Sequence, residues 1–236
     1  MQQLLPILMI IGFAVIAGVG IYFGHIQAKK RREAMALLAN ELGMSFNPAR
    51  DSDHDDHYAH FEIFRRGDNR TAYNTLFGER TVNAIRLVVK AGDFRYTVTT
   101  GSGKDRKTTT YNFSYLIVHL PYPTMPDLLI RPEHVFDRIA GVFSNKDIDF
   151  ESEEFSRRFM VASPDRKFAY DICHPCMIEF LLETRPPAVD IERARLCLAD
   201  GSRTWTPEQF RWMLQFADTF LGHWPDHVVK DLTHTT

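Results

Sequence analysis

The chain has 236 residues, of which 44% are hydrophobic and 25% are charged, a composition typical of a globular protein with one sizeable core. Its formal net charge of −2 argues against a general nucleic-acid-binding protein, because such proteins usually carry a strongly basic face. Three cysteines are too few for a disulfide-stabilised scaffold, and an odd number cannot pair completely.

Residues 4–23 form an uninterrupted apolar run, LLPILMIIGFAVIAGVGIYF, without a charged side chain. As a helix this run would be about 30 Å long, which is the thickness of the hydrocarbon core of a bilayer. The alternative is a cleaved signal peptide, but no Lys or Arg precedes the run and no small-residue cleavage site follows it. The sequence therefore predicts a transmembrane anchor over residues 1–28, with residues 4–23 in contact with the lipid bilayer.

Four basic residues, Lys29, Lys30, Arg31 and Arg32, directly follow the apolar run. The positive-inside rule assigns such a cluster to the cytoplasmic side, and the cluster also favours contact with anionic lipid headgroups. The sequence therefore predicts that these four residues lie at the membrane surface and that the soluble domain is cytoplasmic, where thiols stay reduced.

A basic juxtamembrane helix and a polar linker are predicted over residues 29–56. Met35, Leu38 and Leu42 recur at helical spacing, so this helix is expected to dock on the domain or on a partner helix. Gly43 is expected to end the helix, and the Asp- and His-rich stretch that follows is expected to be a polar loop.

Strands dominate the first half of the soluble domain, which is predicted over residues 57–236. Alternating or β-branched stretches predict strands over residues 60–66, 80–100 and 108–121, the last two as an antiparallel hairpin. The stretch 189–201 is also expected to be one strand.

Helices come mostly in the second half. Residues 132–143, 164–172, 174–183 and 206–224 are predicted helices, whereas 155–163 is predicted as a strand. Together the elements predict an α+β fold, in which an N-terminal transmembrane helix precedes one soluble domain with a mainly antiparallel sheet and several packed helices.

Cys173 and Cys176 form a C-x-x-C pair with His174 and Pro175 between them. Pro175 predicts a helix start, and the dipole at a helix N-terminus stabilises a thiolate, as in redox C-x-x-C sites. A thioredoxin-like pair follows a strand, however, and the preceding stretch here is predicted to be helical. Cys173 and Cys176 are therefore candidate redox residues, and the alternative is a helix start in which Cys176 packs towards the core.

A metal site is a second possibility. His54, His57 and His60 lie in an aspartate-rich stretch, and both residue types bind divalent cations. These histidines are candidate metal ligands, and a solvated linker is the alternative interpretation. A zinc ion held by the cysteine pair would need two more ligands, which could come from Cys197 and one of His119, His134 or His174.

Cofactor motifs are missing from the sequence. TGSGK has neither the glycine spacing nor the following Ser or Thr of a phosphate-binding loop. No cofactor is predicted, and whether the protein is an enzyme is left open.

Several short motifs lie within residues 35–222: LLANELG, F-x-I-F-x-x-G from Phe61 to Gly67, NTLFG, LIRPE and DIDFESEEFSRRF. In these motifs the chain resembles an uncharacterised family of bacterial membrane-anchored proteins that carry a domain of unknown function. The resemblance implies a single-pass protein of the bacterial inner (plasma) membrane, and it brings no catalytic residues.

The sequence thus predicts a membrane-anchored cytoplasmic domain that is non-enzymatic and binds an unknown protein or small molecule, with no nucleic-acid partner. The alternative function is a membrane-tethered thiol–disulfide or metal-binding protein that uses Cys173 and Cys176.

Overall fold

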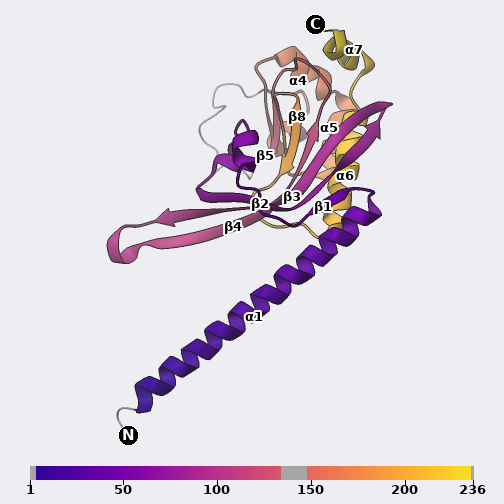
Figure 1. The fold of residues 1–236 in the computed structure, drawn as a ribbon. Helices are drawn as coiled ribbons and strands as arrows, with labels where there is room; N and C mark the ends of the chain where they lie inside the picture. The colour runs from indigo at the N-terminus through magenta and orange to yellow at the C-terminus, as the bar shows by residue number, and fades with distance from the viewer. Residues whose placement is uncertain (1–3, 134–147, 235–236) are drawn as a thin grey trace.

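The computed structural model describes residues 4–133 and 148–234. Its centre is an eight-stranded sheet in the order β1-β2-β3-β4-β8-β7-β5-β6, in which all neighbouring strands run antiparallel (Figure 1). The strands are β1 Ser45–Asn47, β2 Asp68–Val82, β3 Ile85–Thr100, β4 Lys107–His119, β5 Leu128–Pro132, β6 Phe159–Ala162, β7 Ala188–Glu192 and β8 Arg195–Ala199. The predicted α+β class with a mainly antiparallel sheet is therefore confirmed.

The helices pack mainly on one face of this sheet, which bears the larger hydrophobic core. They are α1 Leu4–Glu41, α2 His54–His57, α3 Glu153–Arg158, α4 Arg166–Ile172, α5 Pro175–Thr184, α6 Pro207–Gly222 and α7 Asp226–His234, with 3₁₀ turns η1 Glu62–Arg65 and η2 Gly103–Asp105. The predicted helices at α4, α5 and α6 are confirmed. Thr206 and Gln209 cap the start of α6 reciprocally, with Pro207 in the first turn.

Two predicted strands are in fact hairpins. The prediction over 80–100 contains the turn between β2 and β3, where Asn83 and Ala84 have φ values of 48° and 63°. The prediction over 189–201 contains the turn between β7 and β8, where Arg193 and Ala194 have φ values of 49° and 55°. Two-residue turns of this kind need positive φ at both positions, and neither pair contains the glycine that usually signals them.

The other face of the sheet carries an aromatic cluster covered by α2 and η1. Here the predicted strand over 60–66 is wrong. Phe61 and Phe64 are both fully buried, because a 3₁₀ turn brings residues three apart to the same side. The Phe64 ring packs on Phe94 of β3 and Phe113 of β4, and the Phe61 ring packs on Phe64. The predicted polar loop likewise contains the short helix α2, whose His54 is buried.

The predicted strand over 155–163 is helical in its first half. The Ser152 side chain accepts a hydrogen bond from the Phe155 amide and starts α3, and β6 follows only from Phe159. Pro132 ends β5 instead of starting a helix, and residues 134–143 of the helix predicted over 132–143 lie outside the described residues.

The predicted transmembrane helix is wrong. Among the described residues, no helix is both long and apolar enough to cross a membrane. α1 is 38 residues long and extends away from the sheet (Figure 1).

The last turns of α1 dock on the domain, as the apolar stripe predicts. Met35 and Leu38 are 0% and 1% exposed, and Leu42 packs against the same core. Gly43 ends the helix in a left-handed conformation, with φ of 66°.

Candidate functional site

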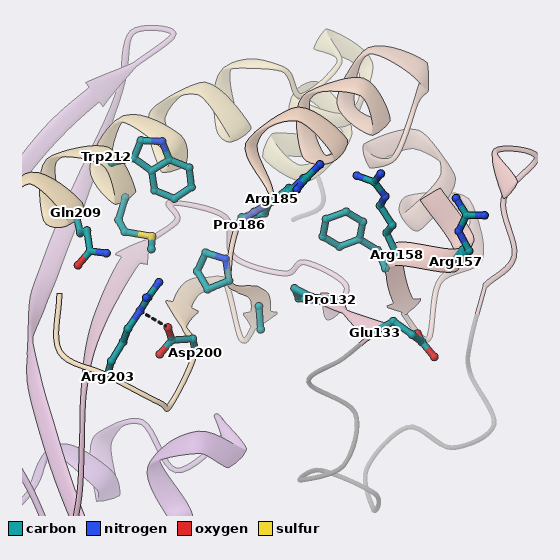
Figure 2. A pocket seen from close by; sticks show the side chains of 14 residues that line it. Pro132, Glu133, Arg157, Arg158, Arg185, Pro186, Asp200, Arg203, Gln209 and Trp212 are labelled. Atoms are coloured by element: carbon teal, nitrogen blue, oxygen red, sulfur yellow. Dashed lines mark ion pairs between the residues drawn. The ribbon is translucent and has the colours of Figure 1, made fainter. Parts of the chain in front are cut away.

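A pocket of about 790 Å³ lies beside the N-terminal half of α6, between the α3–β6 junction and the start of β7 (Figure 2). This volume falls within the range of pockets that bind small molecules, roughly 300–1,000 Å³. The lining residues are Pro132, Glu133, Arg157, Arg158, Phe159, Arg185, Pro186, Pro187, Ala188, Asp200, Arg203, Gln209, Trp212 and Met213. We call it the arginine pocket.

The chain reversal after α5 shapes one wall of the arginine pocket. Arg185 caps α5 in the left-handed conformation, with φ of 48°, and its amide donates to the Leu181 carbonyl at 3.0 Å. The following prolines, Pro186 and Pro187, cannot continue the helix, so the chain enters β7 at Ala188. The Arg185 side chain therefore leaves the helix end at the pocket and not along the helix surface (Figure 2).

The pocket has an apolar floor. Phe159 and Met213 are 5% and 7% exposed and belong to the main core, whereas Trp212 is 38% exposed and stacks on Phe216 with ring centroids 5.6 Å apart. A large aromatic side chain that stays exposed beside buried apolar residues indicates a surface suited to an apolar ligand group.

Four arginines surround this floor, and two of them are already paired. Arg203 Nε lies 3.5 Å from an Asp200 carboxylate oxygen, and Arg158 Nη2 lies 2.8 Å from Glu154 (Figure 2 marks the first pair). The other two, Arg157 and Arg185, are exposed, and neither forms an ion pair within residues 4–133 or 148–234. The pocket rim therefore carries an excess of positive charge.

The four basic residues of the predicted membrane-surface cluster, 29–32, do not share one environment. Lys29, Lys30 and Arg32 are exposed, and Lys29 makes only a surface contact of 3.8 Å with Glu33. Arg31, in contrast, is partly buried and turns towards Asp93 of β3.

Arg31 binds Asp93 in a bidentate manner. Its Nε and Nη2 donate to the two Asp93 carboxylate oxygens at 3.0 and 2.7 Å, and its Nη1 donates to the Trp205 carbonyl at 2.6 Å. Asn74 and Ser114 also donate to Asp93, at 3.0 and 2.6 Å. We call these groups the Arg31 network; it joins α1, the sheet and the segment before α6.

The candidate redox residues differ in exposure. Cys176 is exposed, but Cys173 is 3% exposed and burial raises the pKa of its thiol to about 12. Cys173 caps the C-terminal end of α4, where the helix dipole disfavours a thiolate, and a helix precedes the pair as predicted. This environment makes Cys173 a poor nucleophile.

The zinc ligands considered from the sequence are not brought together. Cys173 belongs to the main core and Cys197 to the aromatic cluster, on opposite faces of the sheet. His119 contacts Tyr58 of the aromatic cluster, His174 binds the His223 carbonyl on the other side, and His134 lies outside the described residues.

The three candidate metal ligands near α2 are also separated by their environments. His54 is fully buried, His57 is exposed, and burial lowers the pKa of the half-buried His60 to about 4. In the described part of the chain, no three His, Cys, Asp or Glu side chains form a group that could hold a metal ion.

His54 has an unusual environment. Its ring lies 4.6 to 5.6 Å from the rings of Tyr58, Phe64, Phe94 and Tyr115, and neither ring nitrogen has a hydrogen-bond partner among the described residues. Burial, with a smaller contribution from Lys90, lowers the pKa of His54 well below its usual value.

The sequence does not predict the arginine pocket. Its lining comes from five separate stretches between Pro132 and Met213, so no local motif marks it. The available signal was the Arg185-Pro186-Pro187 run, which stops a helix directly before a strand and leaves a cationic side chain at the turn.

The fold and pocket describe a class of protein, an antiparallel α+β domain with a docked N-terminal helix and a surface pocket. No family model matches the chain, and neither does any curated protein. A solved structure is similar: the mycobacterial trehalose monomycolate transport factor A, at 13% sequence identity and a TM-score of 0.55, over 82% of this chain and 96% of that one. At such low identity the likeness shows a shared fold alone, and the family resemblance stays a prediction.

Proposed function

We propose that this protein is a non-enzymatic binding module and that its α+β domain binds a lipid-type ligand in the arginine pocket. The observation that carries the proposal is the exposed Trp212 above a floor of Phe159 and Met213, in a pocket of about 790 Å³. An apolar pocket with a few polar groups at its edge is the usual form of a small-molecule site.

The similar structure supports the lipid class. That protein is named as a transport factor for trehalose monomycolate, and its fold extends over 82% of this chain. Since the two chains share a fold and not a close sequence, we carry over only the general class of ligand and propose no transport reaction.

We also propose that the protein works at the cytoplasmic face of a bacterial inner membrane. Exposed apolar side chains of α1, among them Ile16, Ile21 and Phe23 at 72%, 75% and 60% exposure, precede the exposed Lys29 and Lys30. Apolar groups followed by basic groups suit the boundary between acyl chains and anionic headgroups. Flotation of the full chain with vesicles containing anionic lipid tests this, and a protein that stays at the bottom of the gradient contradicts it.

Lipid binding in the pocket can be tested by tryptophan fluorescence. Trp205 and Trp224 are 1% and 4% exposed, so Trp212 is the tryptophan that a ligand in the pocket reaches. A short-chain lipid with a brominated acyl chain should quench the fluorescence of the full chain saturably, and Trp212→Phe should abolish that quenching. The proposal fails if the quenching does not saturate. It also fails if the protein neither carries lipid after purification nor binds added lipid in the titration.

A further inference from the structure

We propose that the ligand of the arginine pocket is an anionic lipid with a phosphate headgroup, which Arg157 and Arg185 bind while the acyl chain lies along Trp212. This inference rests on the proposed lipid-binding function. It adds the charge of the ligand and the two residues that select it.

The rim of the arginine pocket carries more arginine side chains than carboxylates to pair with them. Arg203 is matched by Asp200 and Arg158 by Glu154, which leaves Arg157 and Arg185 without an ion pair in the described part of the chain. Glu133 is then the one remaining carboxylate among the lining residues. Two guanidinium groups against one carboxylate leave a net positive charge at the opening, which attracts an anion. Arginine favours phosphate because its planar donor groups match two phosphate oxygens.

The dipoles of α3 and α5 oppose this attraction for an anion. Arg157 lies in the last turn of α3 and Arg185 caps α5, so both are at helix C-terminal ends. Such an end carries roughly −0.5 of an elementary charge, and less in a helix as short as α3, whereas each guanidinium carries a full positive charge on a long side chain nearer the opening. The net field at the rim therefore favours anions, and the dipoles hold the two arginines in place.

The pocket also offers an apolar surface for a second part of the ligand. The rim arginines lie on the α3 and α5 side of the pocket, and the exposed Trp212 lies across from them on α6 (Figure 2). A ligand that spans this opening needs an anionic end and an apolar end, which free phosphate lacks. A choline headgroup would bring a positive charge against the arginines, so the pocket is expected to discriminate against zwitterionic lipids.

The test is an equilibrium titration of the full chain, followed by Trp212 fluorescence, with three probes: dihexanoyl phosphatidic acid, dihexanoyl phosphatidylcholine and inorganic phosphate. The phosphatidic acid is expected to bind roughly tenfold or more tightly than the choline lipid, with an affinity that falls as salt is raised. Arg157→Gln combined with Arg185→Gln should remove this preference and leave the affinity for the choline lipid unchanged.

A matched control combines Arg106→Gln and Arg166→Gln, which change two exposed arginines that do not line the pocket. This control should keep the preference, and circular dichroism should show that both double variants are folded. Equal binding of both lipids by the native chain overturns the inference and leaves the proposed function standing. The inference is also overturned if inorganic phosphate binds as tightly as the lipid, or if the pocket double variant behaves as the control does. Failure of every lipid to bind refutes the proposed function itself.

Discussion

Replacing Arg31 by alanine is expected to destabilise the fold by about 3 kcal/mol, whereas the same change at the neighbouring Arg32 should have little effect. Both belong to one basic cluster in the sequence, but only Arg31 contacts the sheet. Arg32 is exposed, and among the described residues its one hydrogen bond goes to the Ala28 carbonyl, at 3.4 Å. The pair of variants therefore separates a structural arginine from a surface arginine at adjacent positions.

The magnitude follows from the burial of Asp93, whose side chain is 1% exposed. Removing one partner of a buried ion pair costs about 3–5 kcal/mol, because the remaining charge stays desolvated without compensation. The lower end applies here, since Asn74 and Ser114 still donate to Asp93 and the Arg31 side chain is 22% exposed. Replacing Asp93 by asparagine in the Arg31→Ala background should recover part of the loss, because no unpaired charge remains.

Urea unfolding, followed by circular dichroism, measures the effect. With a urea dependence of about 3 kcal/mol per molar, a loss of about 3 kcal/mol lowers the unfolding midpoint by about 1 M. Hydrogen exchange at residues 31–41 should also accelerate if the network holds α1 on the domain. If Arg31→Ala and Arg32→Ala differ by less than about 0.5 kcal/mol, the reasoning from Asp93 burial is refuted.

Three further predictions concern the cysteines, His54 and two glycines. Thiol titration of the native chain should label Cys176 alone rapidly, because the other two cysteines are buried; rapid labelling of a second thiol would contradict this. The native pKa of His54 lies below its unfolded value, so the unfolded state binds more protons and stability should fall as the pH drops below about 6.5, by at most about 1.4 kcal/mol per pH unit. His54→Phe should reduce that slope in urea unfolding between pH 7 and pH 5, whereas His60, whose pKa burial also lowers, still contributes. An unchanged slope would exclude His54 as a source. Gly67→Ala should cost about 2 kcal/mol more than Gly103→Ala, since both have φ of 59° but only at Gly67 would the new Cβ collide with the Thr97 carbonyl; equal melting temperatures would refute the clash.

Local signals predicted helices α4, α5 and α6, but not α3. Thr206 and Gln209 start α6 through capping contacts within one turn, and Pro175 marks the first turn of α5. Both helix starts can therefore be predicted directly from the sequence. The hairpin turns were missed because Asn83-Ala84 and Arg193-Ala194 adopt positive φ without glycine. In those turns the pairing of the flanking strands overrides local preference.

Long-range partners could not be predicted. In the sequence nothing distinguishes Arg31 from the basic residues beside it, because its partner Asp93 is 62 residues away. His54 lies in a run of aspartates and histidines, and its burial depends partly on the distant rings of Phe94 and Tyr115, which β3 and β4 contribute. The arginine pocket has the same origin, because Arg157 and Arg185 meet Trp212 only through the fold.

Because the Arg31 network fixes α1 to the domain, α1 acts as a rigid connection between the domain and the far end of the helix. The helix continues from Arg31 back to Leu4 without a break, a distance of about 40 Å at 1.5 Å per residue. A rigid helix transmits rotation as well as length, so whatever holds its far end also sets the direction in which the arginine pocket opens. Each residue inserted ahead of Arg31 would turn the pocket by about 100° around the helix axis, whereas a flexible tether would leave its orientation free.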